Sequence, residues 1–171
     1  MIQPLPEANH PSLEVGEPLP DQEIFEVFQK VLEKWAFLPS EYIGKVEEGP
    51  ANLPLERMVA FTGPRQGLMV VRAQEEFGEF LWENLFGVEG TPLEPSREDA
   101  FTEFVNLFFG HLSQRLRHSS SGTFEPFLPQ ASHPGLWPPR RPTVGFAVLV
   151  DGIPLEIRLW MENPPSPGSS L

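Results

Sequence analysis

The 171-residue sequence lacks cysteine, has a single tyrosine, and carries only half as many basic as acidic side chains. Without cysteine, it can form no disulfide, thiolate nucleophile or cysteine-ligated zinc site, which fits the cytoplasm. The net charge of −12 argues against nucleic acid and anionic membranes, because both require basic patches. No apolar run approaches the roughly 20 residues of a membrane helix, and the basic start of a signal peptide is missing. We therefore expect a cytoplasmic protein.

Proline and phenylalanine are abundant, with 21 and 14 copies. The length favours one domain with a substantial core, and the phenylalanines predict that this core is built from large apolar rings. Residues 1–20 hold five prolines and no periodic apolar pattern, so we expect a disordered Pro-rich leader. Residues 162–171 are expected to form a disordered tail. The domain is therefore predicted to span residues 21–161.

Apolar periodicity and turn residues divide this domain into nine expected elements. The helices are predicted at 21–37, 74–86 and 94–117, and the strands at 42–47, 57–62, 67–72, 124–128, 143–150 and 155–160. The last two strands form the clearest hairpin, joined around Asp151-Gly152. A helix followed by three strands occurs twice. The order predicts an α+β fold with two pseudo-equivalent halves that form one largely antiparallel sheet, with helices packed on it.

The segment between the first and second strands of the second half, 129–142, is expected to be a long loop, because proline interrupts both helices and sheets. Long ordered loops are often functional. Trp137 beside Arg140 and Arg141 is compatible with two interpretations. It either anchors a partner protein or packs on the core while the arginines are solvated.

The helix predicted at 94–117 has a clear N-terminal cap and one apolar side. Ser96 is a suitable N-cap, and Asp99, three residues later, can close a capping box. One side of the helix carries an apolar stripe of helical period, which predicts a buried face. The stripe consists of Phe101, Phe104, Val105, Phe108 and Leu112.

The opposite side of this helix carries Asp99, Glu103, Asn106, Gly110 and Ser113. Glu103 and Asn106 are three residues apart, so their side chains are neighbours on the surface. An asparagine in mid-helix costs about half a kcal/mol relative to alanine, and a glycine costs about 1 kcal/mol. Gly110 also clears space for another surface to approach. A solvated helix face is the plainer interpretation of the same pattern.

Four positions resemble the signature of the CheX/CheC/FliY chemotaxis phosphatases. That signature places Asp or Ser, then Glu four residues later, Asn three residues after that, and Pro after a gap of twenty-two residues. Asp99, Glu103, Asn106 and Pro129 occupy these positions. The resemblance covers roughly residues 21–161 and is closest to the single-site CheX type. It implies the same two-halved α+β fold that the element order predicts.

The resemblance implies a phosphatase that acts on the aspartyl-phosphate of a CheY-type response regulator. In that scheme Asn106 orients the attacking water and Glu103 contacts the receiver's active-site lysine. Asp99, Gly110 and Ser113 would border the partner, with Asp99 better explained as a capping residue. The protein would need no cofactor or metal of its own, because the receiver carries the Mg²⁺. A homodimer joined through a sheet edge is also compatible with the resemblance, and the 143–160 hairpin is a candidate edge.

Two other function classes remain open from the residues. The first is a non-catalytic module of the same fold that binds a response regulator or a flagellar motor component. The second is a metal-dependent hydrolase using Glu98, Asp99 and Glu103, although the four histidines lack an HExxH-like spacing. A nucleophilic triad has no support, because the serines at 119–121 lack a G-x-S-x-G elbow.

Overall fold

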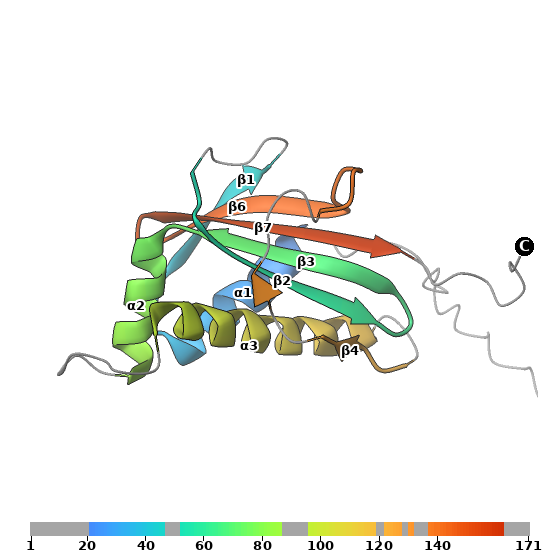
Figure 1. The fold of residues 1–171 in the computed structure, drawn as a ribbon, viewed down its shortest axis with the longest axis horizontal. Helices are drawn as coiled ribbons and strands as arrows, with labels where there is room; N and C mark the ends of the chain where they lie inside the picture. The colour runs from blue at the N-terminus through green and yellow to red at the C-terminus, as the bar shows by residue number, and fades with distance from the viewer. Residues whose placement is uncertain are drawn as a thin grey trace, which may run out of the picture.

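In the computed structural model, the described part of the chain comprises residues 21–46, 52–86, 96–118, 122–127, 130–131 and 137–162. These residues form one antiparallel sheet with helices packed against one of its faces (Figure 1). The core lies between the two layers. The predicted leader and most of the predicted tail lie outside the described residues.

Three helices form the layer below the sheet in Figure 1: α1 (Asp21–Trp35), α2 (Glu75–Phe86) and α3 (Arg97–His118). Each begins with acidic residues in its first turn, where they complement the positive end of the helix dipole. In α3, the predicted apolar stripe is fully buried as expected, and Ala100, Phe109 and Leu116 widen it. This broad apolar flank fixes which side of α3 is left to face outward.

The sheet is antiparallel throughout the described residues, in the order β1-β6-β7-β3-β2-β4, with β5 also paired to β2. Its strands are β1 (Ser40–Lys45), β2 (Leu55–Thr62), β3 (Gln66–Ala73), β4 (Glu125–Pro126), β5 (Gln130–Ala131), β6 (Val144–Val150) and β7 (Ile153–Glu162). The β6–β7 turn is the predicted Asp-Gly turn. Both Asp151 (φ 50°) and Gly152 (φ 80°) lie in the left-handed region that a type I′ hairpin turn requires.

The strand order has the symmetry that the two-halved prediction requires. The centre is the pair β3–β7, the last strand of each half. The first strand of each half pairs with the second strand of the other half: β1 with β6, and β4 and β5 with β2. The α+β prediction is therefore confirmed, with two short strands serving as one in the second half.

The core is a network of aromatic rings between the helices. Phe104 of α3 lies at its centre, with ring centroids 5.6 Å from Phe28 of α1 and 5.5 Å from Phe77 of α2. Phe108 continues the network one turn later, 5.3 Å from Phe28. Edge-to-face pairs of this kind contribute about 0.5–1.5 kcal/mol each beyond their buried area. They hold α3 against both neighbouring helices.

Several sequence expectations are corrected at element ends. The first helix ends at Trp35 rather than at residue 37, where Phe37 takes a left-handed conformation (φ 55°). The apolar period of this helix predicts that Trp35 is buried, but its side chain is 39% exposed. Of the strand expected at 124–128, only Glu125–Pro126 forms a strand within the described residues, although the backbone N–H of Phe127 still donates to the Ala60 carbonyl of β2 at 2.8 Å. Conversely, Gln130–Ala131 forms a short strand where only a loop was expected.

The hairpin considered as a pairing edge is also placed differently. β6 lies between β1 and β7, and β7 lies between β6 and β3, so both strands are interior to the sheet. The open edges within the described residues are β1 on one side and β4 and β5 on the other. The hairpin therefore offers no free edge for a second copy.

Candidate functional site

The N-terminus of α3 is fixed by the predicted capping box. The backbone N–H of Asp99 donates to Ser96 Oγ at 3.1 Å, and the backbone N–H of Ser96 donates to Asp99 Oδ2 at 2.8 Å. The Ser96 hydroxyl also donates to Asp99 Oδ2 at 2.8 Å. These bonds, with a smaller contribution from the positive charge of Arg57, lower the pKa of Asp99 below its ordinary value. The carboxylate of Asp99 is therefore already engaged by its own helix.

Glu103 and Asn106 both lie on the exposed side of α3. The intervening residues Phe104 and Val105 are buried, so the backbone between the pair is anchored while the two polar side chains face solvent. Neither side chain makes a hydrogen bond or ion pair with another described residue. The carboxylate and the amide are therefore available to a partner.

Gly110 lies one turn beyond Asn106, and the surface there is open. A Cβ atom added to Gly110 would meet no heavy atom within 4 Å, leaving aside the helix's own nearby backbone. Ser113, half-buried, donates its hydroxyl hydrogen to the Gly110 carbonyl at 2.8 Å. The Ser113 hydroxyl can therefore only accept a hydrogen bond from a partner. The residues predicted for this side of α3, from Asp99 to Ser113, therefore form an outward stripe in which Gly110 lacks a projecting side chain.

An arginine that no sequence motif singles out contacts the same helix from the sheet. Arg57 of β2 donates from Nε to Thr102 Oγ1 at 2.9 Å and from Nη2 to Glu98 Oε2 at 3.1 Å. Its side chain is 13% exposed. The only available signal was a cation within a strand whose neighbouring inward positions are apolar, a pattern that indicates a specific polar contact.

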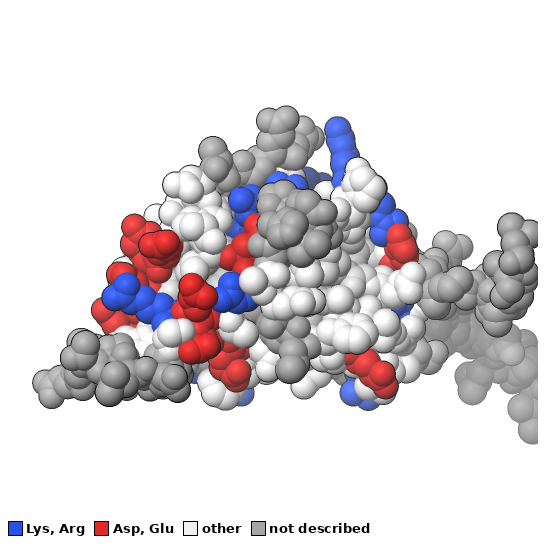
Figure 2. All heavy atoms as spheres, viewed as in Figure 1, with Lys and Arg blue, Asp and Glu red and all other residues white. Residues whose placement is uncertain are grey.

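Charged side chains are unevenly distributed over this end of the molecule. Figure 2 shows them gathered over α2 and the beginning of α3, next to a largely uncharged surface. The acidic residues of α2 include Glu79, which pairs with Arg97 of α3. Charges of both signs therefore meet where α2 lies beside the beginning of α3.

The residues suggested for a metal-dependent hydrolase are not assembled into one site. Glu98 pairs with Arg57, and Asp99 is engaged by Ser96. No group of three metal-ligating side chains occurs within the residues that the structure describes.

Pro129 and the serines at 119–121 lie outside the described ranges. Among the described helices, none is long and apolar enough to cross a membrane.

The outer face of the sheet carries a row of paired charges beneath Trp137. Arg72 lies between Glu56 and Glu156, at 3.0 Å and 3.6 Å respectively, and Arg158 also pairs with Glu156, which is 0% exposed. Trp137 stacks over both guanidinium groups, 5.3 Å from Arg72 and 5.1 Å from Arg158. Trp137 therefore packs against its own sheet, but on the outer face rather than on the core, and Arg140 pairs with Glu162.

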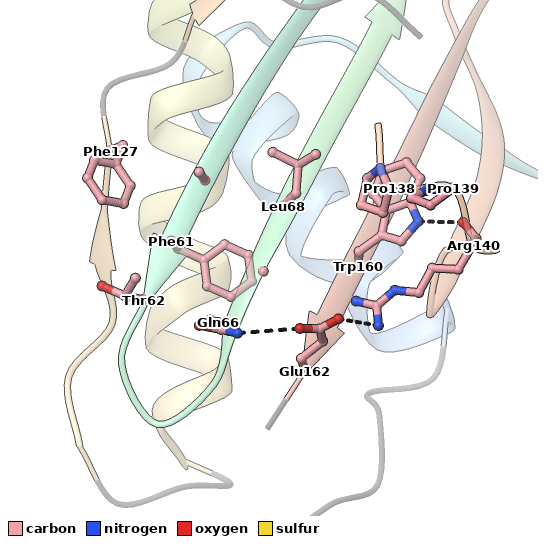
Figure 3. Close-up of a pocket in the computed structure, with 12 residues that line it drawn as sticks. Phe61, Thr62, Gln66, Leu68, Phe127, Pro138, Pro139, Arg140, Trp160 and Glu162 are labelled. Atoms are coloured by element: carbon pink, nitrogen blue, oxygen red, sulfur yellow. Dashed lines mark hydrogen bonds and ion pairs between the residues drawn. The ribbon is translucent and has the colours of Figure 1, made fainter. Parts of the chain in front are cut away.

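A groove of about 540 Å³ lies next to this row on the sheet (Figure 3). Its floor includes Leu68 and Trp160, and Phe127, 57% exposed, stands at one side. Its polar groups satisfy one another: Gln66 donates to Glu162, Glu162 pairs with Arg140, and Trp160 Nε1 donates to the Arg140 carbonyl. The groove therefore presents mainly apolar surface and is not the predicted pair's site.

Comparisons with known proteins identify the fold. No family model matches the chain, and no curated protein matches it. The solved structures include a CheX chemotaxis protein from Vibrio vulnificus, 16% identical, with a TM-score of 0.65 over 82% of this chain and 95% of that one. A CheC-like superfamily protein from Shewanella sp. PV-4 is 12% identical, with a TM-score of 0.64 over 85% and 99%.

A third match is the structure of a CheX–CheY–BeF₃–Mg²⁺ complex from Borrelia burgdorferi. It is 16% identical, with a TM-score of 0.57 over 82% of this chain and 96% of that one. The chain thus spans nearly the whole of these proteins. The predicted resemblance to CheX-type proteins is confirmed at the level of fold.

Proposed function

We propose that this protein stimulates hydrolysis of the aspartyl-phosphate on a CheY-type receiver domain, using Glu103 and Asn106. The observation that carries the proposal is the outward presentation of this carboxylate and amide from a helix whose opposite flank is fully buried. The fold supports it, since one protein of this fold has been crystallised in a complex with CheY. The Glu-x-x-Asn spacing supplies the two groups that the reaction needs.

Asn106 orients the attacking water. A side-chain amide both donates and accepts hydrogen bonds, so it can hold a water molecule in line with the phosphorus atom. Phosphoryl transfer requires positioning and charge stabilisation more than covalent help from the enzyme. A hundredfold acceleration requires about 2.7 kcal/mol, within the range of one well-placed hydrogen-bonding group.

Glu103 fixes the partner. Its carboxylate would pair with the lysine of the receiver's active site and set the register of the two proteins. The receiver would also supply the Mg²⁺ that neutralises the phosphoryl oxygens, so this chain needs no metal of its own. Asp99 would stay with the helix cap, while Gly110 and the exposed side of Ser113 would border the docked receiver.

The test follows the decay of a receiver phosphorylated by a small phosphodonor, with and without this protein. Wild type should accelerate phosphate release. Glu103→Ala should raise the protein concentration needed for half-maximal effect, because it removes the contact that holds the receiver. Glu103→Gln serves as the matched control, since it keeps the shape and removes the charge. If both variants act like wild type at every concentration, Glu103 has no role in docking.

The alternative is a non-catalytic module that binds the receiver through the same face of α3. The assay above separates the two, because a binder without the reaction would leave the acyl-phosphate lifetime unchanged or lengthen it. Binding measured in parallel by calorimetry would then show a complex without turnover. That combination would replace the phosphatase proposal by the binding one.

A further inference from the structure

We propose that Arg57 is the positioning residue of the Glu103–Asn106 pair, locking the rotation of α3 so that both side chains reach a docked receiver. The inference rests on the proposed function, because it adds a residue to that same site. It starts from an observation that packing alone does not explain: an arginine stands in a strand on the side that faces the helices.

Arg57 shares the inward side of β2 with Leu55, Val59 and Phe61, all apolar. Burying a guanidinium group costs free energy unless its donors are matched. Here they are matched by Thr102, Glu98 and the backbone carbonyl of Glu56, at 2.9, 3.1 and 2.9 Å. Each of the three guanidinium nitrogens thus donates a hydrogen bond to a different acceptor.

These contacts form a connected chain of hydrogen bonds across the first two turns of α3. Arg57 donates to the Thr102 hydroxyl, and that hydroxyl donates to the Glu98 carbonyl at 2.8 Å. Thr102 directly precedes Glu103 and lies four residues before Asn106, which places it on an adjacent part of the helix surface. The hydrogen bond from Arg57 of the sheet therefore reaches α3 directly beside Glu103 and Asn106.

Apart from the exposed Arg97–Glu79 ion pair, the other contacts of this part of α3 with its neighbours are apolar, and rings make up most of them. Phe104 and Phe108 fix the depth of the helix against its neighbours, but ring contacts tolerate sliding and small rotations better than directional hydrogen bonds do. A side-chain atom roughly 6 Å from the helix axis moves about 1 Å when the helix turns by about 10°. A displacement of this size can cost about a hundredfold in rate. The Arg57–Thr102–Glu98 chain removes that freedom.

The test compares Arg57→Met with Arg115→Met. Arg115 makes the corresponding long-range ion pair at the far end of α3, to Glu23 of α1 at 3.4 Å, and serves as the matched control. Arg57→Met should lower kcat for phosphate release at least tenfold with KM changed less than threefold, whereas Arg115→Met should leave both near wild type. Thr102→Val should reproduce the loss, and Thr102→Ser, which keeps the hydroxyl, should restore activity.

Two further measurements separate positioning from general damage. In an Asn106→Ala background, Arg57→Met should lower the rate no further. In the free protein, Arg57→Met should shift the NMR side-chain amide resonances of Asn106, and Arg115→Met should not. Three results would each overturn the inference. They are unchanged Asn106 resonances in Arg57→Met, an equal loss of rate from Arg57→Met with and without Asn106→Ala, and an equal loss of rate from Arg115→Met. If wild type fails to accelerate hydrolysis, the proposed function falls, and the resonance comparison still decides whether Arg57 positions Asn106.

Discussion

Gly110 offers a perturbation in which stability and function should move in opposite directions. It lies in the interior of α3, where glycine costs about 1 kcal/mol relative to alanine. A methyl group added there meets no heavy atom within 4 Å apart from the helix's own nearby backbone, so no packing strain offsets the gain. Gly110→Ala should therefore raise the free energy of unfolding by about 1 kcal/mol, or the melting temperature by roughly 3 °C for a domain of this size.

The same open surface is where the receiver should approach most closely. Gly110→Leu keeps the gain in helix propensity but projects a bulky side chain beside Asn106. It should lower the affinity for the phosphorylated receiver at least tenfold while the protein remains at least as stable as wild type. Chemical denaturation measures the stability, and titration calorimetry with the receiver measures the affinity.

Gly78→Ala in α2 is the matched control, because it adds the same methyl group in a packed environment. Its added Cβ would lie 3.0 Å from Leu55 Cδ1 and 3.4 Å from the Arg97 carbonyl oxygen. Gly78→Ala should therefore gain less stability than Gly110→Ala, or lose some. The reasoning is refuted if Gly110→Ala gives no stabilisation, or if Gly110→Leu binds the receiver as tightly as wild type does.

Four further predictions concern the cap of α3, the aromatic core and the buried charges of the sheet. Ser96→Ala should cost about 1 kcal/mol of stability by removing the cap of α3. Because the folded pKa of Asp99 lies below its ordinary value, the advantage of wild type over Asp99→Asn should be full at neutral pH and disappear as the pH falls through the folded pKa; urea titrations across that range measure it. Phe104→Ala should cost about 3–5 kcal/mol, seen by calorimetry, because three rings lose their central partner. Glu156→Gln, which leaves Arg158 without a carboxylate and Arg72 paired with Glu56 alone, should lower the unfolding midpoint far more than Arg140→Gln at an exposed pair.

Local chemistry made much of the fold predictable. The apolar stripe of α3 repeats at helical period, so its buried face follows from geometry alone. The Ser96–Asp99 cap and the Asp151-Gly152 turn depend on residues within three positions of each other, and both have the predicted hydrogen bonds or dihedral angles. For the same reason, the outward position of Glu103 and Asn106 could be predicted from the helix period.

What could not be predicted depends on residues distant in sequence. Arg57 meets Thr102 across 45 positions and Trp137 meets Glu56 across 81, and no local pattern encodes either contact. β4 and β5 are too short for periodicity and exist because the edge of β2 is available for pairing. Trp35 fits the helical stripe of α1 but lies at the helix end, where the core no longer covers it.

The measurement that tests the central claim most directly is single-turnover decay of the phosphorylated receiver at saturating Asn106→Ala protein. Asn106 is exposed and its side chain makes no hydrogen bond with another described residue, so this variant should fold and dock as wild type does. The account predicts that the complex forms with wild-type affinity while the acyl-phosphate decays at the receiver's own rate. Decay at the wild-type accelerated rate would contradict it.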